Sequence, residues 1–545
     1  MSEAVACETP REWARPDFPS HYVWAQFDFR ANRGSHVLQP ALPRIRLEIA
    51  RAWQMVIRLK GVEALAIAQR IERQPGSSLG PATMAVRCEL AAIKAAAFVL
   101  RDDGEAALAA ALAALRLGAA SPTAHVALTV CRCIYWRLGD LDSFHAVERC
   151  KSGVQPGRLR TLTTMLDLAL DAAVELGQMR FHSARLLASD ALDVARCFIG
   201  NIVPIDSLPA CVMAQLMYEE GRLDEAEALV STRLAGIRQG GAIEGAVRGL
   251  GLLARIAANR NRLEQALALL AEANGLATKH DWPRLQAASL AQQVELYVAA
   301  GRFDEAQRHA HRLGILAAQC GSGSSTLRFE LARYHLLAQT RFALARTPDA
   351  VDLASLHRLH DDTVSRGDRY AAVTTALLLI EALLAADRRE EAAEALVALL
   401  KQAADAGLYQ TLIDCGERVA GLIDAVVAEE IMVATEVREL LPYARALMAR
   451  RRQGAARKEA EGESIRDAAR PATSAGLSER EHAIIGLMGC GLTNKQIAMR
   501  LRIAPETVKS YAKHLYAKLG ARNRTEASML ASRLGLIRLS GRDLD

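Results

Sequence analysis

A six-residue pattern returns along the chain at steps of about 40 residues, and no other feature constrains the fold as strongly. The pattern reads GRLDEA at Gly221–Ala226, NRLEQA at Asn261–Ala266 and GRFDEA at Gly301–Ala306. A Gly or Asn suits the residue that ends a helix, and an acidic residue suits the positive end of the next helix dipole. The Ala that follows lets the two helices approach closely. Because periods of roughly 20–50 residues are typical of stacked repeats, the pattern predicts a solenoid of helical hairpins.

The repeat extends beyond these three copies. GDLDSF at Gly139–Phe144 and DRREEA at Asp387–Ala392 follow a similar order of residue types. About nine such units would fill residues 46–449 and would present a concave surface for recognition. A purely structural spacer stays open as the alternative. Weaker echoes of the pattern end near Ala64, Ala106, Ala184 and Ala350.

The units resemble tetratricopeptide repeats, although they are longer than the usual length of about 34 residues. Composition favours an all-α chain, because 51% of the residues are hydrophobic but only 5% are aromatic, and the dominant Ala and Leu are strong helix formers. We therefore expect a TPR-like helical-hairpin solenoid. No apolar run reaches the length of a membrane span and no signal peptide is visible, so we expect a cytoplasmic protein that does not contact membranes.

Two segments do not follow the repeat. In residues 1–45, several Trp and Pro residues interrupt any long helix, so we expect a tail or, in preference, a cap on the first repeat. Residues 450–476 are rich in charge, Ala, Gly and Ser, which indicates a flexible linker. Residues 477–545 after the linker are expected to form a small four-helix domain.

Local signals place the helices of this last domain. Thr493 and Gln496 have the spacing of a capping box, so the second helix is expected to begin there. Pro505 suits the first position of the third helix, and the fourth is expected over residues 523–533. Two helices joined by a short turn, the second with an apolar back and a basic front, are typical of a helix-turn-helix motif.

Polar side chains gather on the front of the predicted third helix. Lys509, Ser510 and Lys513 lie away from its apolar stripe, so they can enter a major groove and reach base edges or phosphates. Residues 477–545 hold 12 Lys and Arg against 6 Asp and Glu, and this net charge of +6 equals that of the whole chain. Excess positive charge confined to one small domain is expected of phosphate binding.

The start of the predicted second helix offers a second contact with a phosphate. Thr493, Asn494 and Lys495 lie there, where the first N–H groups of a helix have no partner within it. Together with the Asn and Lys side chains, these groups would form a phosphate clamp.

The C-terminal segment closely resembles the LuxR-type (FixJ/NarL-like) DNA-binding domain over about 60 residues, in LSERE, GLTNKQIAMRL, TVK at 507–509 and KLGARNRTEA. The resemblance implies a four-helix domain whose third helix reads DNA and whose fourth often forms dimer contacts. It also implies double-stranded DNA and RNA polymerase as partners, and a homodimer on DNA. The DNA-facing positions that it implies are Asn494, Lys495, Thr507, Lys509, Ser510 and Lys513.

Two residues depart from that family pattern. Ala504 replaces the usual Ser before the proline, which removes a side-chain N-cap and costs about 1 kcal/mol. Tyr511 replaces the usual His. A phenol can still reach a phosphate, so Tyr511 is kept among the predicted DNA-binding residues.

The whole arrangement resembles the C-terminal part of MalT-like large LuxR regulators, which also carry an NTPase module. This chain contains no Gly-Lys pair and hence no phosphate-binding P-loop motif. No catalytic constellation is visible either, so we expect no enzymatic activity and no cofactor.

Two groups of residues carry metal-binding side chains, but we expect no metal. Cys131, Cys133 and Cys150 contain a C-x-C spacing, which is unusual for a structural zinc site. Residues two apart on a helix also point to different faces. His357 and His360 lie one turn apart and are interpreted as part of a polar helix face.

These observations together predict a bacterial transcriptional regulator. The C-terminal domain would read the major groove, and the repeats would sense a small-molecule or protein effector and control DNA binding or oligomerisation. The alternative is a repeat-based adaptor whose terminal domain docks protein rather than DNA.

Overall fold

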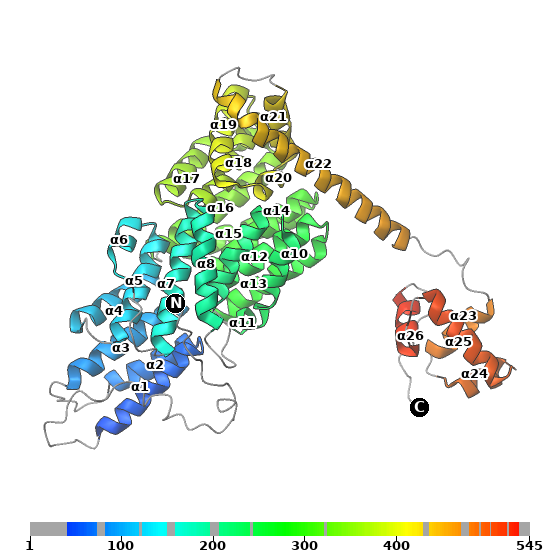
Figure 1. Cartoon of the computed structure of the whole chain (residues 1–545), viewed down its shortest axis with the longest axis horizontal. Helices are drawn as coiled ribbons and strands as arrows, with labels where there is room; N and C mark the ends of the chain where they lie inside the picture. The colour runs from blue at the N-terminus through cyan, green and yellow to red at the C-terminus, as the bar shows by residue number, and fades with distance from the viewer. Residues whose placement is uncertain are drawn as a thin grey trace, which may run out of the picture. The chain divides into compact units, whose positions relative to one another are not determined.

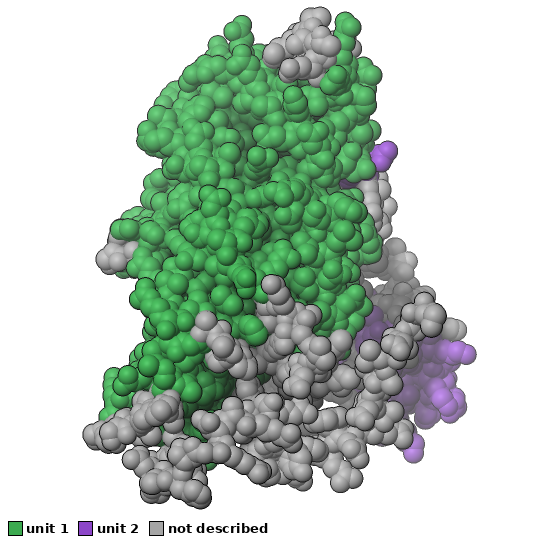
Figure 2. Space-filling view, turned by 60° about the vertical axis from the view of Figure 1, so that its left-hand side comes forward, with its two compact units in different colours: residues 1–451 green, residues 452–545 purple. Residues whose placement is uncertain are grey.

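The chain forms two compact units, residues 1–451 (unit 1) and residues 452–545 (unit 2), which Figure 2 shows in different colours. The predicted cap or tail at residues 1–45 lies largely outside the described residues. The computed structural model describes residues 41–73, 82–118, 122–149, 158–196, 206–239, 243–320, 324–428, 435–469, 479–489, 492–501, 503–519, 521 and 523–533.

The described residues contain 26 α-helices, one 3-10 helix and no strand, which confirms the predicted all-α class (Figure 1). No helix among them combines the length and the apolar character needed to cross a membrane. The first ten are α1 (Ala41–Ile57), α2 (Gly61–Glu72), α3 (Ala82–Leu100), α4 (Gly104–Leu117), α5 (Pro122–Leu138), α6 (Leu141–Ala146), α7 (Arg158–Gly177), α8 (Phe181–Arg196), α9 (Ser207–Glu219) and α10 (Leu223–Ser231). Unit 1 continues with α11 (Leu234–Arg238), α12 (Ile243–Asn259), α13 (Leu263–His280), α14 (Pro283–Ala299), α15 (Phe303–Gln319), α16 (Ser325–Arg346), η1 (Pro348–Ala350), α17 (Leu353–Ser365), α18 (Arg369–Ala385), α19 (Arg389–Ala406), α20 (Gln410–Ile413) and α21 (Glu417–Val427).

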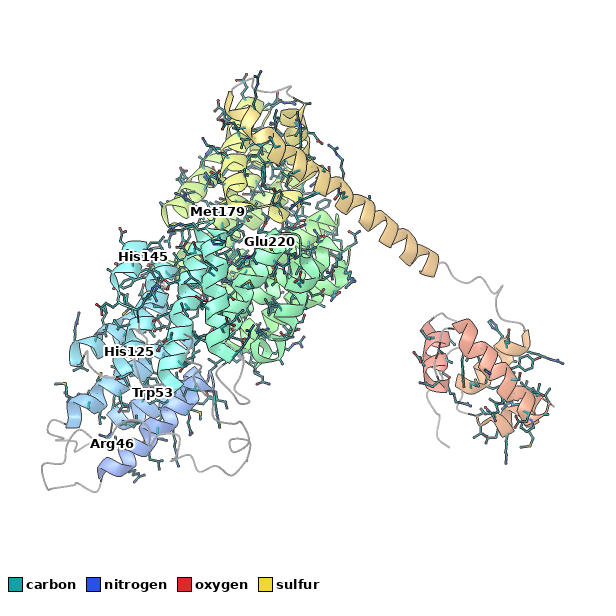
Figure 3. The ribbon with its side chains drawn as sticks, viewed as in Figure 1. Arg46, Trp53, His125, His145, Met179 and Glu220 are labelled. Carbon is teal, nitrogen blue, oxygen red and sulfur yellow. The ribbon has the colours of Figure 1, made fainter. Side chains whose placement is uncertain are left out.

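Eleven turns between consecutive helices of unit 1 share one geometry in the described residues. A residue with positive φ ends the first helix, and the next N–H donates to the carbonyl five residues before it. At Gly221, for example, φ is +80° and the Arg222 N–H lies 2.9 Å from the carbonyl oxygen of Met217. This hydrogen bond satisfies an orphan carbonyl at the helix end. The left-handed residues are Leu59, Asp102, Gly139, Met179 (labelled in Figure 3), Gly221, Asn261, Asp281, Gly301, Gly367, Asp387 and Gly407.

The predicted close approach of the two helices follows directly after most of these turns. Five residues beyond the left-handed residue the side chain is buried in ten of the eleven turns, and it is Ala in eight of these. Gln286, five residues beyond Asp281, is half-buried, and the buried Leu412 follows Gly407. Phe144 takes this place in the turn at Gly139. A residue without a bulky side chain lets the second helix pack tightly on the first, as the repeat pattern predicts.

Of the four weaker echoes, the one near Ala106 matches its turn to within one residue and the one near Ala350 does not match a turn. The echo near Ala106 corresponds to the neighbouring Ala107, which is fully buried. The echo near Ala350 was wrong, because Ala350 lies in the 3-10 helix η1 and is exposed. Helix α16 continues to Arg346, past the position of the expected turn, and the chain instead turns at Gly367 with φ +74°.

The solenoid winds far enough that segments remote in sequence come into contact. The indole N–H of Trp282 donates to the carbonyl oxygen of Leu100 at 3.1 Å, and Arg366 donates to that of Leu138 at 3.0 Å. Glu219 is fully buried and accepts a hydrogen bond from the Thr411 N–H at 2.9 Å. We call the segments that meet in this way successive passes of the solenoid.

Helix α22 (Thr435–Ala469) leads from unit 1 into unit 2. Its first half is anchored, because Ala444, Leu447 and Met448 are buried in the core shared with α18 and α19. Residues 450–469 continue this helix, whereas the sequence predicted a flexible linker over 450–476. The reason is that the Ala, Arg, Lys and Glu of this segment are strong helix formers, which outweigh its few Gly and Ser residues.

Unit 2 contains α23 (Glu479–Gly489), α24 (Asn494–Leu501), α25 (Pro505–Leu519) and α26 (Arg524–Arg533). These four helices match the predicted terminal domain. They enclose a core of their own, formed by Ile484, Ile485, Met488, Ile497, Ala498, Val508, Ala512, Leu515, Ala527 and Ala531.

Candidate nucleic-acid interface

Capping groups fix where α24 begins. The Thr493 N–H donates to Oε1 of Gln496 at 2.8 Å, and Oγ1 of Thr493 accepts from the Gln496 N–H at 3.4 Å. This reciprocal pair is the predicted capping box. The Thr493 hydroxyl also donates to Gln496 Oε1 at 2.9 Å, so its proton serves the cap. Thr493 therefore sets the start of α24 and is not free to donate to a phosphate as it stands.

Helix α25 begins at Pro505, as predicted. Proline fits there because its fixed φ suits a helix and its missing N–H would have no helical partner. Ala504 supplies only its backbone carbonyl, which accepts from the Thr507 N–H at 3.0 Å and the Val508 N–H at 3.3 Å. The start of α25 is thus held by backbone bonds without the side-chain cap that a Ser would give.

The core orients α25. Val508, Ala512 and Leu515 repeat at helical spacing and are buried against α23, α24 and α26. Because these three side chains hold one face of the helix inward, the opposite face must point to solvent. This arrangement decides which polar side chains a ligand of unit 2 meets.

Four of the predicted DNA-binding residues lie on that outer side of α25. Thr507, Lys509, Ser510 and Lys513 are all exposed. The ammonium of Lys509 is 3.9 Å from a carboxylate oxygen of Glu506, with both side chains more than 70% exposed. An ion pair this exposed contributes little to stability, so Lys509 is available to bind another anion.

Tyr511 lies differently from these four residues. It is half-buried, and its ring packs against the core of unit 2. The Tyr511 side chain therefore supports α25 while part of it stays accessible to solvent. The predicted contact of the phenol with a phosphate would have to be made from this accessible part.

Asn494 and Lys495 occupy the first turn of α24. Lys495 is exposed, and Asn494 is half-buried. Oδ1 of Asn494 accepts a hydrogen bond from Nη1 of Arg524 at 3.3 Å. Arg524 also donates to the carbonyl oxygens of Met488, at 3.3 Å, and Leu492.

Two residues of this site are not among those predicted from the sequence. Glu506 is exposed beside Lys509 on the outer face of α25, where a carboxylate can accept from the amino group of cytosine. Its place in the first turn, just after Pro505, was a signal that it shares the face of Lys509. Arg524 has no such local signal, because its partners lie 30 residues or more earlier in the chain.

A second cluster of charge lies inside unit 1. The inner ion cluster consists of Asp102, Arg137, Glu244, Arg248 and Arg284. Asp102 lies 2.6 Å from Arg137 and 3.2 Å from Arg284, and Glu244 pairs with Arg284. Burial alone would raise the pKa of Glu244, but the guanidinium groups of Arg284, Arg137 and Arg248 lower that pKa to about 2. The cluster therefore keeps its charges and joins two passes of the solenoid.

The cysteines and histidines weighed as metal ligands do not come together. Among the described residues, no group of three or more His, Cys, Asp or Glu has the proximity of a metal site. Burial raises the pKa of both Cys131 and Cys133 to about 11. Cys150 lies outside the described residues. His360 instead contacts the Thr375 hydroxyl through Nδ1 at 3.0 Å.

Two family models match the chain. The MalT-like TPR region matches residues 88–429, and the luxR family of bacterial regulatory proteins matches residues 475–531. Together they match most of the solenoid and the four short helices of unit 2, in the order that the sequence predicts.

Individual proteins give the same division. The HTH-type transcriptional regulator MalT of Vibrio campbellii is 25% identical over 348 residues, which cover 61% of this chain and 36% of that protein. The DNA-binding transcriptional activator DevR/DosR of Mycobacterium tuberculosis is 49% identical over 59 residues, 11% of this chain and 27% of that protein. The chain thus spans about a third of the length of the MalT relatives that it matches.

A solved structure resembles the solenoid. The Rap protein complexed with competence and sporulation factor has a TM-score of 0.50 and 13% identity, covering 67% of this chain and 99% of that chain. At this identity the likeness concerns the fold alone.

Proposed function

Because the chain belongs to the family of the MalT-like TPR region and carries a domain of the luxR family of bacterial regulatory proteins, we propose that it regulates transcription by reading duplex DNA. The observation that carries the proposal is the outer face of α25. Lys509, Ser510 and Lys513 are exposed together on a helix whose other face is fixed by a buried core. A helix of this kind fits a major groove, where lysine reaches guanine acceptors or phosphates.

The contacts with DNA divide into two groups. Thr507, Lys509, Ser510 and Lys513 on α25 would face the groove. Asn494, Lys495 and Tyr511 would bind phosphates beside it. Thr493 would act through the capping box that fixes α24. Two copies of the chain would bind half-sites about one helical turn apart, as two-fold related readers do.

Selection of duplexes from a random pool by the full-length chain tests this proposal. We expect a consensus site whose affinity falls steeply as salt concentration rises, because bound phosphates release counterions. Absence of salt-sensitive duplex binding would instead favour the adaptor, in which unit 2 docks protein. Met499 on α24, 77% exposed, would be the apolar contact available to such a partner or to RNA polymerase.

The repeats would sense an effector through the inner ion cluster. Its residues come from α12 and α14 and from Asp102 and Arg137 earlier in the chain. An effector with charged or hydrogen-bonding groups would exchange partners with these side chains. Because the cluster joins two passes of the solenoid, such an exchange would change how tightly the passes are held together.

Helix α20 contacts both the passes of the solenoid and α22, so it could transmit a change between the passes to the helix that leads to unit 2. On one side, Nδ2 of Asn259 donates to Oδ1 of Asp414 at 2.6 Å, next to α20. On the other side, Nη1 of Arg451 on α22 donates to the carbonyl oxygens of Ile413 at 2.5 Å and Cys415 at 2.8 Å. A shift of α20 relative to α12 would therefore move the anchor of the helix that leads to the DNA-binding unit.

A further inference from the structure

The guanidinium group of Arg524 connects three parts of unit 2. It belongs to the first turn of α26 and contacts the carbonyl oxygen of Met488 in α23, that of Leu492 in the loop, and Asn494 at the start of α24. Arg524 is half-buried. Its guanidinium N–H groups therefore donate to the segment that precedes α24 and to the first residue of that helix.

The hydrogen bond from Arg524 fixes the orientation of the Asn494 side-chain amide. A primary amide has an acceptor oxygen at one end and two N–H donors at the other. Oδ1 of Asn494 faces Arg524, so Nδ2 points the other way, and the described residues offer Nδ2 no acceptor. Phosphate oxygens and the N7 and O6 atoms of purines are acceptors. The amide is thus presented to DNA with its donor end.

We propose that Arg524 is a positioning residue of the DNA interface, which holds the Asn494 amide with its NH2 group toward the duplex. The inference rests on the proposed function of unit 2 and adds a residue outside the recognition helix to its binding machinery. Without Arg524, no donor would fix Oδ1, and the amide would be free to turn its oxygen toward a phosphate, which repels it.

Arg524 also has contacts that a purely structural role would explain. Its bonds to the carbonyl oxygens of Met488 and Leu492 place a positive charge at the C-terminal end of α23, where the helix dipole is negative. A structural role predicts a loss of stability that is independent of residue 494. A positioning role predicts a loss of DNA affinity that requires Asn494.

A double-mutant cycle on the full-length chain separates these roles. The probe is the duplex selected from the random pool by the wild-type protein, titrated at one fixed salt concentration. We expect Arg524→Ala and Asn494→Ala each to weaken binding about five-fold, as for one hydrogen bond. The double variant should also lose about five-fold rather than the product of the two losses. Arg524→Lys keeps the charge but loses the fork, so it should behave like Arg524→Ala.

Asn494→Asp keeps the test decisive if the Arg524 variants fail to fold. It retains an oxygen acceptor for Arg524 but replaces the NH2 donors with a negative oxygen. We expect weaker DNA binding than in Asn494→Ala, with a melting temperature of unit 2 no lower than that of the wild type. Wild-type affinity of Asn494→Asp would overturn the proposal.

Other outcomes also have fixed meanings. An Arg524→Ala loss that persists undiminished in the Asn494→Ala background would overturn the positioning role and leave duplex binding intact. If the selection with the wild-type chain enriches no duplex, the proposed function is overturned, and the positioning role with it.

Discussion

Trp282 and Leu100 lie 182 residues apart in the sequence, yet the indole N–H of one donates to the carbonyl oxygen of the other at 3.1 Å. Trp282 is 2% exposed and stacks on His280, with ring centroids 4.7 Å apart. This contact joins the start of α14 to the end of α3. The passes of the solenoid are therefore held by specific hydrogen bonds as well as by apolar packing.

Trp282→Phe should loosen this contact without removing the aromatic ring. The substitution leaves the Leu100 carbonyl without its donor, which costs about 1 kcal/mol or somewhat more. Hydrogen exchange measured peptide by peptide should become about five-fold faster in α3, α4 and α14. The helices of unit 2 serve as the internal control, since they have a separate core. Equal exchange in α3 before and after the substitution would contradict the role given to Trp282.

Gly301→Ala and Gly275→Ala should change stability in opposite directions. Gly301 has φ +69°, whereas Gly275 lies within α13, and an added Cβ would meet no atom within 4 Å at either position. Steric contacts are therefore absent from both, and only backbone preference differs. We expect Gly301→Ala to destabilise unit 1 by about 1 kcal/mol and Gly275→Ala to stabilise it by about 0.5–1 kcal/mol. Denaturant unfolding monitored by circular dichroism measures both, and shifts of the same sign would be inconsistent with the turn geometry.

Glu244→Gln should remove a stabilisation that depends on pH. The Glu244 pKa is about 2 in the folded chain, below the value of about 4.3 for an unfolded glutamate. A carboxyl whose pKa is lowered by folding stabilises the folded state above its unfolded pKa. That stabilisation is lost as pH falls from about 4.3 toward the folded pKa.

The difference in stability between wild type and Glu244→Gln should accordingly be largest near neutral pH and shrink below about pH 4. Glu264→Gln is the matched control, because Glu264 pairs with Arg302 at 3.2 Å but is 83% exposed. An exposed ion pair contributes little to the free energy of unfolding at any pH. A loss of stability in Glu244→Gln that is equally large at about pH 6 and about pH 3 would contradict the description of the inner ion cluster as a paired network.

Lys509→Ala and Lys513→Ala should each weaken binding of the selected duplex. If a lysine contacts a phosphate, its removal makes the plot of log affinity against log salt shallower by about one unit. If it contacts a base, affinity falls chiefly for the selected site and less for unrelated duplexes. Lys401→Ala is the control, because Lys401 is an exposed lysine of α19 in unit 1. A control variant that behaves like the other two would show that the effect is one of total charge.

Local chemistry made much of this fold predictable. The turns at Gly221, Asn261 and Gly301 carry residues that suit a left-handed backbone, and the Thr493–Gln496 capping box marks α24. The turns at Leu59 and Met179 were visible only as weak echoes, because neither residue favours positive φ and tertiary packing must impose it. Such turns follow from the period of the repeat rather than from the residue at the turn.

Contacts between distant segments could not be predicted in the same way. Nothing near Trp282 specifies Leu100 as its partner, and nothing near Arg524 specifies Asn494. The first pair depends on the sum of the small angles between successive helices along the solenoid. The second pair depends on how four short helices pack around one core. On α25, by contrast, helical periodicity alone separated the outward Lys509 and Lys513 from the buried Val508.

We propose that unit 2 reads specific duplex sites through α25. Genome-wide occupancy of the full-length chain, compared with that of the Lys509→Ala/Lys513→Ala double variant, tests it most directly. We predict sharp peaks that share one sequence and disappear in the double variant. Peaks of equal height in both proteins would contradict the claim.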